Sequence, residues 1–326
     1  MSSRTQRSAL GLAVVVAGLL AGCGLGAGPT PGGVQLLITR EFGARTVRAL
    51  RAPASHGQET VMSLLRRNAT VGTRYGGGFV QSIDGHSGGY DGSEPVDWFY
   101  YVNGVEGSKG AAEADVHAGD RVWWDMHDWN QTDYIPAVVG SYPEPFRHGI
   151  DGRRLPVRVE CADPEGEPCR TISGRLRDAG VPAARAQLSP AGAGPQSLRV
   201  LVGTWTQVRG EAGARVLEGG PGTSGVYARP AAAGATIALL DERGRAVRTL
   251  AAGSGLIAAT RHEQDAPEWI VTGTDAAGVA LAAGAFVEAD LRGRFAIALA
   301  AGSPGTGAAA TTGLSAATVL PLPRPG

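Results

Sequence analysis

The sequence has no excess charge of either sign and almost no lysine. Among its 326 residues, Lys plus Arg and Asp plus Glu each number 30, and Lys109 is the only lysine. Proteins that bind nucleic acid need a basic surface to neutralise phosphates. The balanced composition therefore argues against a nucleic-acid partner, while a hydrophobic fraction of 43% is enough for folded cores.

The chain also lacks an apolar run long enough to span a bilayer. The run "ALGLAVVVAGLL" (9–20) follows Arg4 and Arg7 and would cover only about 18 Å as a helix, against a bilayer core of about 30 Å. It leads into "LAGC" (20–23), which resembles the bacterial lipobox, in which the cysteine is lipidated. We therefore expect a signal peptide (1–22), a lipid anchor on Cys23, a Gly/Pro-rich tether (23–33) and an extracytoplasmic protein on the cell membrane. An ordinary signal peptide with a chance cysteine is the alternative.

Cysteine is scarce, and its scarcity limits the chemistry. Besides Cys23 the chain holds only Cys161 and Cys169, with no CxxC motif and no histidine cluster nearby. An exported protein meets an oxidising compartment, which favours a disulfide over a metal site or a nucleophile. We expect these two cysteines to be bridged, and we expect no metal and no cofactor.

Residues 34–135 have the pattern of one small domain that combines a sheet with a helix. Apolar alternation and turn residues predict strands, and helical spacing predicts an amphipathic helix over 57–69. The expected strands are two around the turn "EFGA" (41–44), then 78–85, 97–107 (with the hairpin signal Asn-Gly) and 118–129. This order, β-β-α-β-β-β, is typical of a β-grasp.

The same residues carry a family resemblance. "TVMSLL" (60–65), "FVQSIDG" (79–85), "WFYYVNG" (98–104) and "AGDRVWWDMHDW" (118–129) resemble the transcobalamin-like C-terminal domain family. The likeness covers about a third of the chain, residues 34–135. It implies a β-grasp module and, by its relation to vitamin B12 carriers, a corrinoid-like ligand, although the chain has no second domain of the kind that those carriers use.

Tryptophans crowd the stretch "RVWWDMHDW" (121–129). Strand alternation places Val122, Trp124 and Met126 on one face, suited to the helix-side core, and puts two indoles with an acid and an imidazole on the other. Thirteen of the nineteen aromatic residues lie between Tyr75 and Phe146, too many for one small core. We therefore expect a partly exposed ligand face, since exposed apolar patches usually mark interaction sites. The expected ligand-binding residues are Trp123, Trp129, Phe99, Tyr101, Asn103, Asp125 and His127.

Three other interpretations of this region remain beside the ligand face. Aromatic pairs across strands can simply stiffen a sheet. A metal site is disfavoured because the acids and His127 lack the ligand spacing of zinc sites. Catalysis is disfavoured as well: His86 adjoins Ser87 in the Gly-rich loop 84–92, but no G-x-S-x-G motif occurs and no acid–base set stands out. We therefore expect that the protein is not an enzyme.

Beyond this domain the pattern changes. A Pro/Gly-rich connector (136–154) should cross the surface without regular structure, with Tyr142 and Phe146 docking it on the first domain. Residues 155–301 alternate strands with helices and predict an α/β domain with a mixed sheet, including a helix that starts near Pro168 and another capped by Thr274 or Asp275. The low-complexity tail (302–326) should be flexible.

Together these features predict an α+β protein of two domains and a non-catalytic function. The leading hypothesis is a lipid-anchored binding protein that presents a flat, corrinoid-like small molecule to an uptake transporter. The runner-up is a structural or protein-interaction module of the cell envelope, in which the aromatic residues contact a partner protein.

The anchor is directly testable. Replacing Cys23 with alanine removes the acceptor of the lipid, so the variant should leave the membrane fraction and appear in the soluble extracytoplasmic fraction. Two acyl chains, at about 0.8 kcal/mol per buried CH₂, anchor a protein stably where one does not. A Cys23→Ala protein that still sediments with membranes would rule the anchor out.

Overall fold

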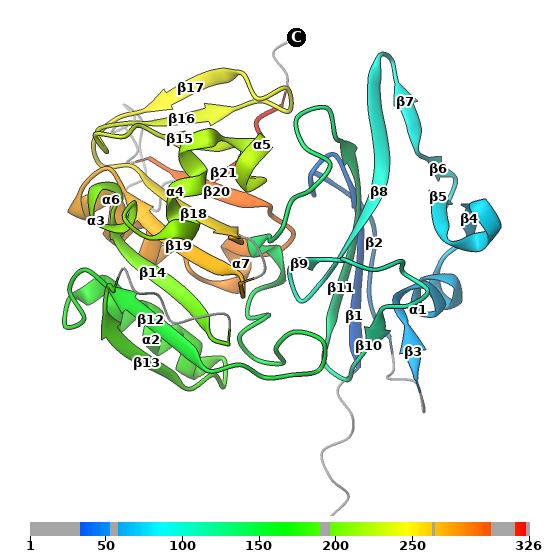
Figure 1. The fold of residues 1–326 in the computed structure, drawn as a ribbon, viewed down its shortest axis with the longest axis horizontal. Coiled ribbons are helices and arrows are strands. Elements are labelled where there is room, and N and C mark those ends of the chain that lie inside the picture. Colours follow the sequence, from blue (N-terminus) through cyan, green and yellow to red (C-terminus); the bar gives the residue numbers. More distant parts are fainter. Residues whose placement is uncertain (1–32, 53–57, 190–195, 263–264, 301–316, 324–326) are drawn as a thin grey trace, which may run out of the picture. The chain divides into compact units, whose positions relative to one another are not determined.

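The computed structural model describes residues 33–52, 58–189, 196–262, 265–300 and 317–323. These residues form a mixed α/β structure, mostly strands arranged in several sheets (Figure 1). A β-rich layout of two domains fits this arrangement. The expected signal peptide and Cys23, together with all of the tether except Gly33, lie outside the described residues. In the described ranges no helix is both long and apolar enough to cross a membrane.

The first sheet has the strand order β2-β1-β11-β8-β7, with β9 paired to β8. Its central pair, β1 and β11, is parallel, and Leu36 lies opposite Val122. The chain reaches β11 only after passing through a helix and two small sheets, which makes this parallel pairing possible. The strands are β1 (Val34–Arg40), β2 (Arg45–Ala52), β7 (Gly89–Asp91), β8 (Glu94–Val102), β9 (Val105–Glu106) and β11 (Arg121–Asp128).

Helix α1 (Val61–Asn68) packs on one face of this sheet. It begins at a capping box, in which the Ser63 amide donates to Thr60 Oγ1 (3.2 Å) and the Thr60 amide donates to Ser63 Oγ (2.8 Å). Its apolar side shares a buried cluster with Trp124 and Val122. The predicted helix and the predicted inward direction of Trp124 are therefore confirmed.

Short strands surround the helix, and a tight turn closes the central hairpin. Asn103 and Gly104 have φ values of 54° and 78°, and they join β8 to β9 as the Asn-Gly signal predicts. The short elements are β3 (Glu59–Thr60) with β10 (Asp115–Val116), and β4 (Val71–Arg74), η1 (Tyr75–Gly77), β5 (Phe79–Ile83) and β6 (His86–Ser87).

The connector is not a surface segment. Most of residues 135–146, which include η2 (Val139–Ser141), are buried. The rings of Tyr142 and Phe146 contact Trp269, with centroids 6.1 and 5.0 Å apart, so the expected docking of these rings on the first domain is wrong. The Pro and Gly content correctly predicted little regular structure. The segment is nevertheless buried, because removing its large apolar side chains from water stabilises the fold.

The second sheet has seven strands in the order β13-β12-β14-β19-β18-β20-β21. The first four strands in this order run parallel to one another, and each of the last three runs antiparallel to the strand before it. This is the mixed sheet that the sequence predicted. The strands are β12 (Val157–Cys161), β13 (Ala183–Gln187), β14 (Leu198–Thr204), β18 (Gly255–Thr260), β19 (Glu268–Gly273), β20 (Ala296–Leu299) and β21 (Thr318–Leu320). The flexible tail expected for 302–326 is wrong in part, because the backbone of β21 pairs with β20. Residues 302–316 and 324–326 lie outside the described residues.

Helices flank this sheet, and one of them carries the disulfide. α2 (Glu167–Asp178) has Pro168 in its first turn and buries Cys169, and the bridge between Cys161 and Cys169 is formed, with a Cα–Cα distance of 6.1 Å. α6 (Ala276–Gly284) is capped by Asp275, whose Oδ1 accepts from the Gly278 amide at 2.9 Å. The remaining elements are α3 (Trp205–Val208), α4 (Ala212–Arg215), η3 (Val216–Gly219), α5 (Pro221–Ser224), α7 (Glu288–Leu291), and a small sheet of β15 (Ala228–Pro230), β16 (Ile237–Leu240) and β17 (Ala246–Leu250).

A buried ionic cluster lies across the parallel strands of this sheet. Arg199 of β14 binds Glu160 of β12 and Glu268 of β19, and its Nη2 lies 2.7 Å from Glu211 Oε2. The Arg199 side chain is only 5% exposed. Burial raises the pKa of Glu268, as do the neighbouring Glu211 and Glu160 carboxylates, and only Arg199 opposes them. Arg199 therefore contacts all three buried acids, and Arg158 adds a second cation to Glu160, with its Nε 3.0 Å from Glu160 Oε1.

Loss of this guanidinium should be costly. Arg199→Met removes the cation that Glu211 and Glu268 contact and leaves Glu160 with Arg158 alone. Breaking a buried ion pair from one side costs about 3–5 kcal/mol. Urea unfolding should show this loss in the free energy of unfolding. The control is Arg185→Met, whose ion pair with Glu165 is exposed and should contribute no more than about 1 kcal/mol. Equal effects of the two substitutions would contradict the role given to Arg199.

Candidate functional site

The face expected to bind a ligand is largely turned into the protein. Trp123 is 1% exposed and Tyr101 0%, and Asp125 and His127 are also buried. The predicted partial exposure of Trp123 is therefore wrong. Trp129 is half-buried, and its Nε1 donates to Asp97 Oδ2 at 3.2 Å.

Phe295, which directly precedes β20 of the second sheet, covers this face. Its ring lies edge-on to three of the expected ligand residues, with centroid distances of 5.0 Å to Trp123, 5.4 Å to His127 and 5.7 Å to Tyr101. Residues of both sheets thus share one buried cluster. The aromatic excess that suggested an exposed platform is explained by this shared core, and no pattern in the sequence indicated that Phe295 would cover the face.

A chain of hydrogen bonds runs through this core. Trp123 Nε1 donates to Thr39 Oγ1 at 2.6 Å, and the Thr39 hydroxyl donates to Asp125 Oδ1. The backbone amides of Gly43 and Phe42 also donate to the carboxylate, at 2.9 and 3.1 Å. Asp125 is 0% exposed, so this set of donors replaces the water that burial removed.

His127 completes the network and orients its other nitrogen. Its Nδ1 lies 2.9 Å from Asp125 Oδ2, and its ring is stacked between Phe42 and Phe99, with centroids at 4.6 and 4.4 Å. A carboxylate on Nδ1 assigns the proton to that nitrogen. In the neutral imidazole, Nε2 is then the hydrogen-bond acceptor.

His127 lies at a cleft of about 570 Å³, which we call the His127 cleft. Tyr90, at its rim, is 79% exposed. Arg40 contributes a cation, whose Nη1 is 3.1 Å from His86 Nδ1 and whose Nη2 is 3.7 Å from Glu41. The lining residues are Arg40, Glu41, Phe42, Gly85, His86, Ser87, Tyr90, Asp91, Val96, Met126, His127, Asp128 and Glu242. Four of them are carboxylic acids, so the cleft is acidic.

Asn103, another expected ligand residue, serves the β8–β9 turn. Its Nδ2 donates to Asp120 Oδ1 at 2.8 Å and to the Gly149 carbonyl at 2.9 Å, and its Oδ1 accepts from the Arg121 amide at 2.9 Å. The side chain is 1% exposed. All of its hydrogen-bonding groups are therefore used inside the protein.

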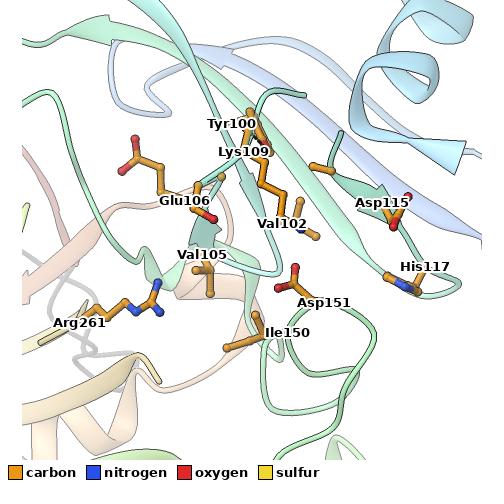
Figure 2. Close-up of a pocket in the computed structure, with 13 residues that line it drawn as sticks. Tyr100, Val102, Val105, Glu106, Lys109, Asp115, His117, Ile150, Asp151 and Arg261 are labelled. Atoms are coloured by element: carbon orange, nitrogen blue, oxygen red, sulfur yellow. Dashed lines mark hydrogen bonds between the residues drawn. The ribbon is translucent and has the colours of Figure 1, made fainter. Parts of the chain in front are cut away.

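A second cleft, of about 230 Å³, was not predicted from the sequence (Figure 2). We call it the Glu106 cleft, after a carboxyl that is 9% exposed and accepts from the Ile135 amide at 2.6 Å. Burial raises the pKa of Glu106 to about 8. Burial and the nearby Asp151 carboxylate raise the pKa of Tyr100 to about 12, and the Tyr100 hydroxyl donates to the Lys109 carbonyl at 2.6 Å. Its lining residues are Tyr100, Val102, Val105, Glu106, Gly107, Ser108, Lys109, Ala114, Asp115, His117, Ile150, Asp151 and Arg261.

The raised pKa of Glu106 implies a dependence of stability on pH. Because the folded state holds this proton more tightly than the unfolded chain, the stabilisation is complete below about pH 4.5 and is lost as the pH rises through about 8. Glu106→Gln keeps an acceptor for Ile135 and cannot ionise. Urea unfolding at both ends of this window should show the wild type losing on the order of a few kcal/mol more than the variant. If the free energy of unfolding changed with pH equally in the two proteins, the raised pKa of Glu106 would be contradicted.

Among the described residues, no group of three or more His, Cys, Asp or Glu side chains could hold a metal ion. Residues 58–128 match the family model of a domain of unknown function, DUF4430. No curated protein matches the chain. One solved structure, described as "a putative metal binding protein" from Ruminococcus gnavus, is 14% identical, with a TM-score of 0.25, over 30% of this chain and 97% of its own. At that TM-score the likeness carries no argument about fold or ligand.

Proposed function

We propose that this protein is a non-catalytic, lipid-anchored binding protein of the extracytoplasmic face, and that the His127 cleft takes a small organic cation with N–H groups. The observation that carries the proposal is the buried Asp125–His127 pair, whose His127 lines this cleft. Binding sites are typically concave, with a few polar groups fixed in place among apolar walls.

His127 selects the hydrogen-bonding group of the ligand. Asp125 holds the proton on Nδ1 and the stacked rings of Phe42 and Phe99 hold the imidazole in place. In this proposal the neutral ring accepts an N–H or O–H of the ligand at Nε2. Little side-chain entropy is lost on binding, because the ring is ordered before the ligand arrives.

The charge of the lining selects a cation. Glu41, Asp91, Asp128 and Glu242 line the cleft, against the single arginine Arg40. A cleft lined by one sign of charge concentrates ligands of the opposite sign. The exposed ring of Tyr90 at the rim can stack on an ammonium or guanidinium group, which contributes about 0.5–1 kcal/mol at exposed sites.

A flat corrinoid-like ligand has less support from the geometry. That ligand was expected to stack on Trp123 and Trp129, but Trp123 lies beneath Phe295 and Trp129 is bonded to Asp97. The acidic cleft instead favours a compact cation. Cobalamin therefore enters the binding test as a competing ligand, and delivery to an uptake transporter remains part of the proposal.

The finer fold assignment is part of the proposal too. A parallel β1–β11 pair at the centre of the sheet, with α1 packed on one face, supports a β-grasp of the transcobalamin-like type for residues 34–135. A module that binds a partner protein is the second candidate. Its support is the exposure of two aromatic rings, Tyr75 at 84% and Tyr90 at 79%.

Titration calorimetry with named cations tests the ligand proposal. The probes are agmatine, putrescine and phenethylamine, with cobalamin as the competitor, added to the ectodomain without its lipid. We expect at least one cation to bind, and His127→Gln and Asp91→Asn each to weaken it about tenfold, as expected for a hydrogen bond to a charged group.

Tyr75→Ala is the matched control for Tyr90→Ala, since both rings are exposed and only Tyr90 lines the cleft. Only the Tyr90 substitution should weaken binding. If none of the cations binds, or if cobalamin alone binds and His127→Gln leaves its affinity unchanged, the proposed ligand class is wrong.

A further inference from the structure

We propose that the Glu106 cleft is a second, separate binding site, for a small zwitterion of the amino-acid class. In this arrangement Lys109 binds the carboxylate of the ligand and Asp151 binds its ammonium group. The site shares no lining residue with the His127 cleft and does not depend on the function proposed for that cleft.

Two opposite charges face one another in this cleft. Figure 2 shows the Lys109 side chain extending into the cleft and the Asp151 carboxylate pointing toward it from the other side. Within the described ranges, neither side chain has a hydrogen bond or an ion pair. A ligand that carries both charges can therefore bind each of them without breaking an existing contact.

The remaining charges make the lining balanced. Arg261 adds a second cation and Asp115 a second carboxylate. The buried carboxyl of Glu106 adds little negative charge at neutral pH, since its pKa is raised to about 8. A lining with two charges of each sign gives no net attraction for a simple ion. It suits a molecule that is itself neutral overall and dipolar.

Apolar side chains complete the wall. Val102, Val105 and Ile150 line the cleft beside the ring of Tyr100. Tyr100 is held by the hydrogen bond from its hydroxyl to the Lys109 carbonyl, at 2.6 Å. This bond ties the backbone of the only lysine to the wall of the cleft. An aliphatic side chain of the ligand would be removed from water against these residues, which favours binding.

The segments that carry the two charges are also held in place. Ile150 forms a β-bridge with Arg153, and Gly149 accepts from the buried Asn103 amide. Asp151 follows directly, with a φ of 49°. Asparagine tolerates this left-handed conformation as aspartate does. Asp151→Asn therefore removes the charge without straining the turn.

The experiment compares leucine with two derivatives that each lack one charge. Leucine, N-acetylleucine and leucinamide are titrated into the ectodomain, and binding is followed by calorimetry and by saturation-transfer NMR. We expect leucine to bind about tenfold or more tightly than either derivative. Lys109→Met and Asp151→Asn should each weaken leucine binding by a similar factor, as expected for hydrogen bonds to charged groups.

Asp91→Asn serves as the control, because Asp91 lines only the His127 cleft, and it should leave leucine binding unchanged. Conversely, Lys109→Met should leave binding of the organic cations unchanged, so that failure at one cleft is distinguishable from failure at the other. The proposal is overturned if leucine does not bind, if its derivatives bind equally well, or if the Lys109 and Asp151 variants retain wild-type affinity.

Discussion

A fully buried carboxylate, that of Asp125, sets a condition that the surrounding structure has to meet. Removing an ionised carboxylate from water is unfavourable unless hydrogen bonds replace its hydration. Here Thr39 of β1 and the amides of Phe42 and Gly43 supply them, so the turn after β1 is fixed against β11. Without these donors the parallel β1–β11 pair would enclose carboxyl oxygens that lack hydrogen-bond partners.

The second constraint is the shared aromatic core around Phe295. This ring contacts Trp123, Tyr101 and His127 of the first sheet, although it belongs to the end of a loop that leads into the second sheet. The polar network beneath it is thereby shielded, which strengthens its hydrogen bonds and makes any unpaired member more costly. The aromatic contacts and the Asp125 network therefore stabilise each other.

Local sequence patterns predicted the strands and helix of residues 34–135 and the sheet face that packs on α1. They did not predict what covers the opposite face, which carries Trp123. Alternation correctly placed Trp124 against α1, the Asn-Gly signal located the β8–β9 turn, and Cys161 and Cys169 form their predicted bridge. These features depend on near neighbours in the chain. The cover over Trp123 comes from Phe295, more than a hundred residues away, and no local pattern encodes such a pairing. The prediction of an exposed connector was wrong for a related reason. Pro and Gly predict an irregular backbone, but they do not predict that the segment is exposed.

The two clefts show how burial turns similar residues into different chemistry. Behind the His127 cleft, the buried Asp125 carboxylate accepts from Thr39 and from the amides of Phe42 and Gly43, and it fixes the His127 imidazole. In the Glu106 cleft a carboxyl with one backbone donor has its pKa raised to about 8, so it contributes little charge at neutral pH. Hydrogen-bond donors favour the charged form of a buried carboxyl, and Glu106 has only one backbone donor. The lining of the first cleft is acidic and that of the second is balanced, and this difference separates the ligand classes proposed for them.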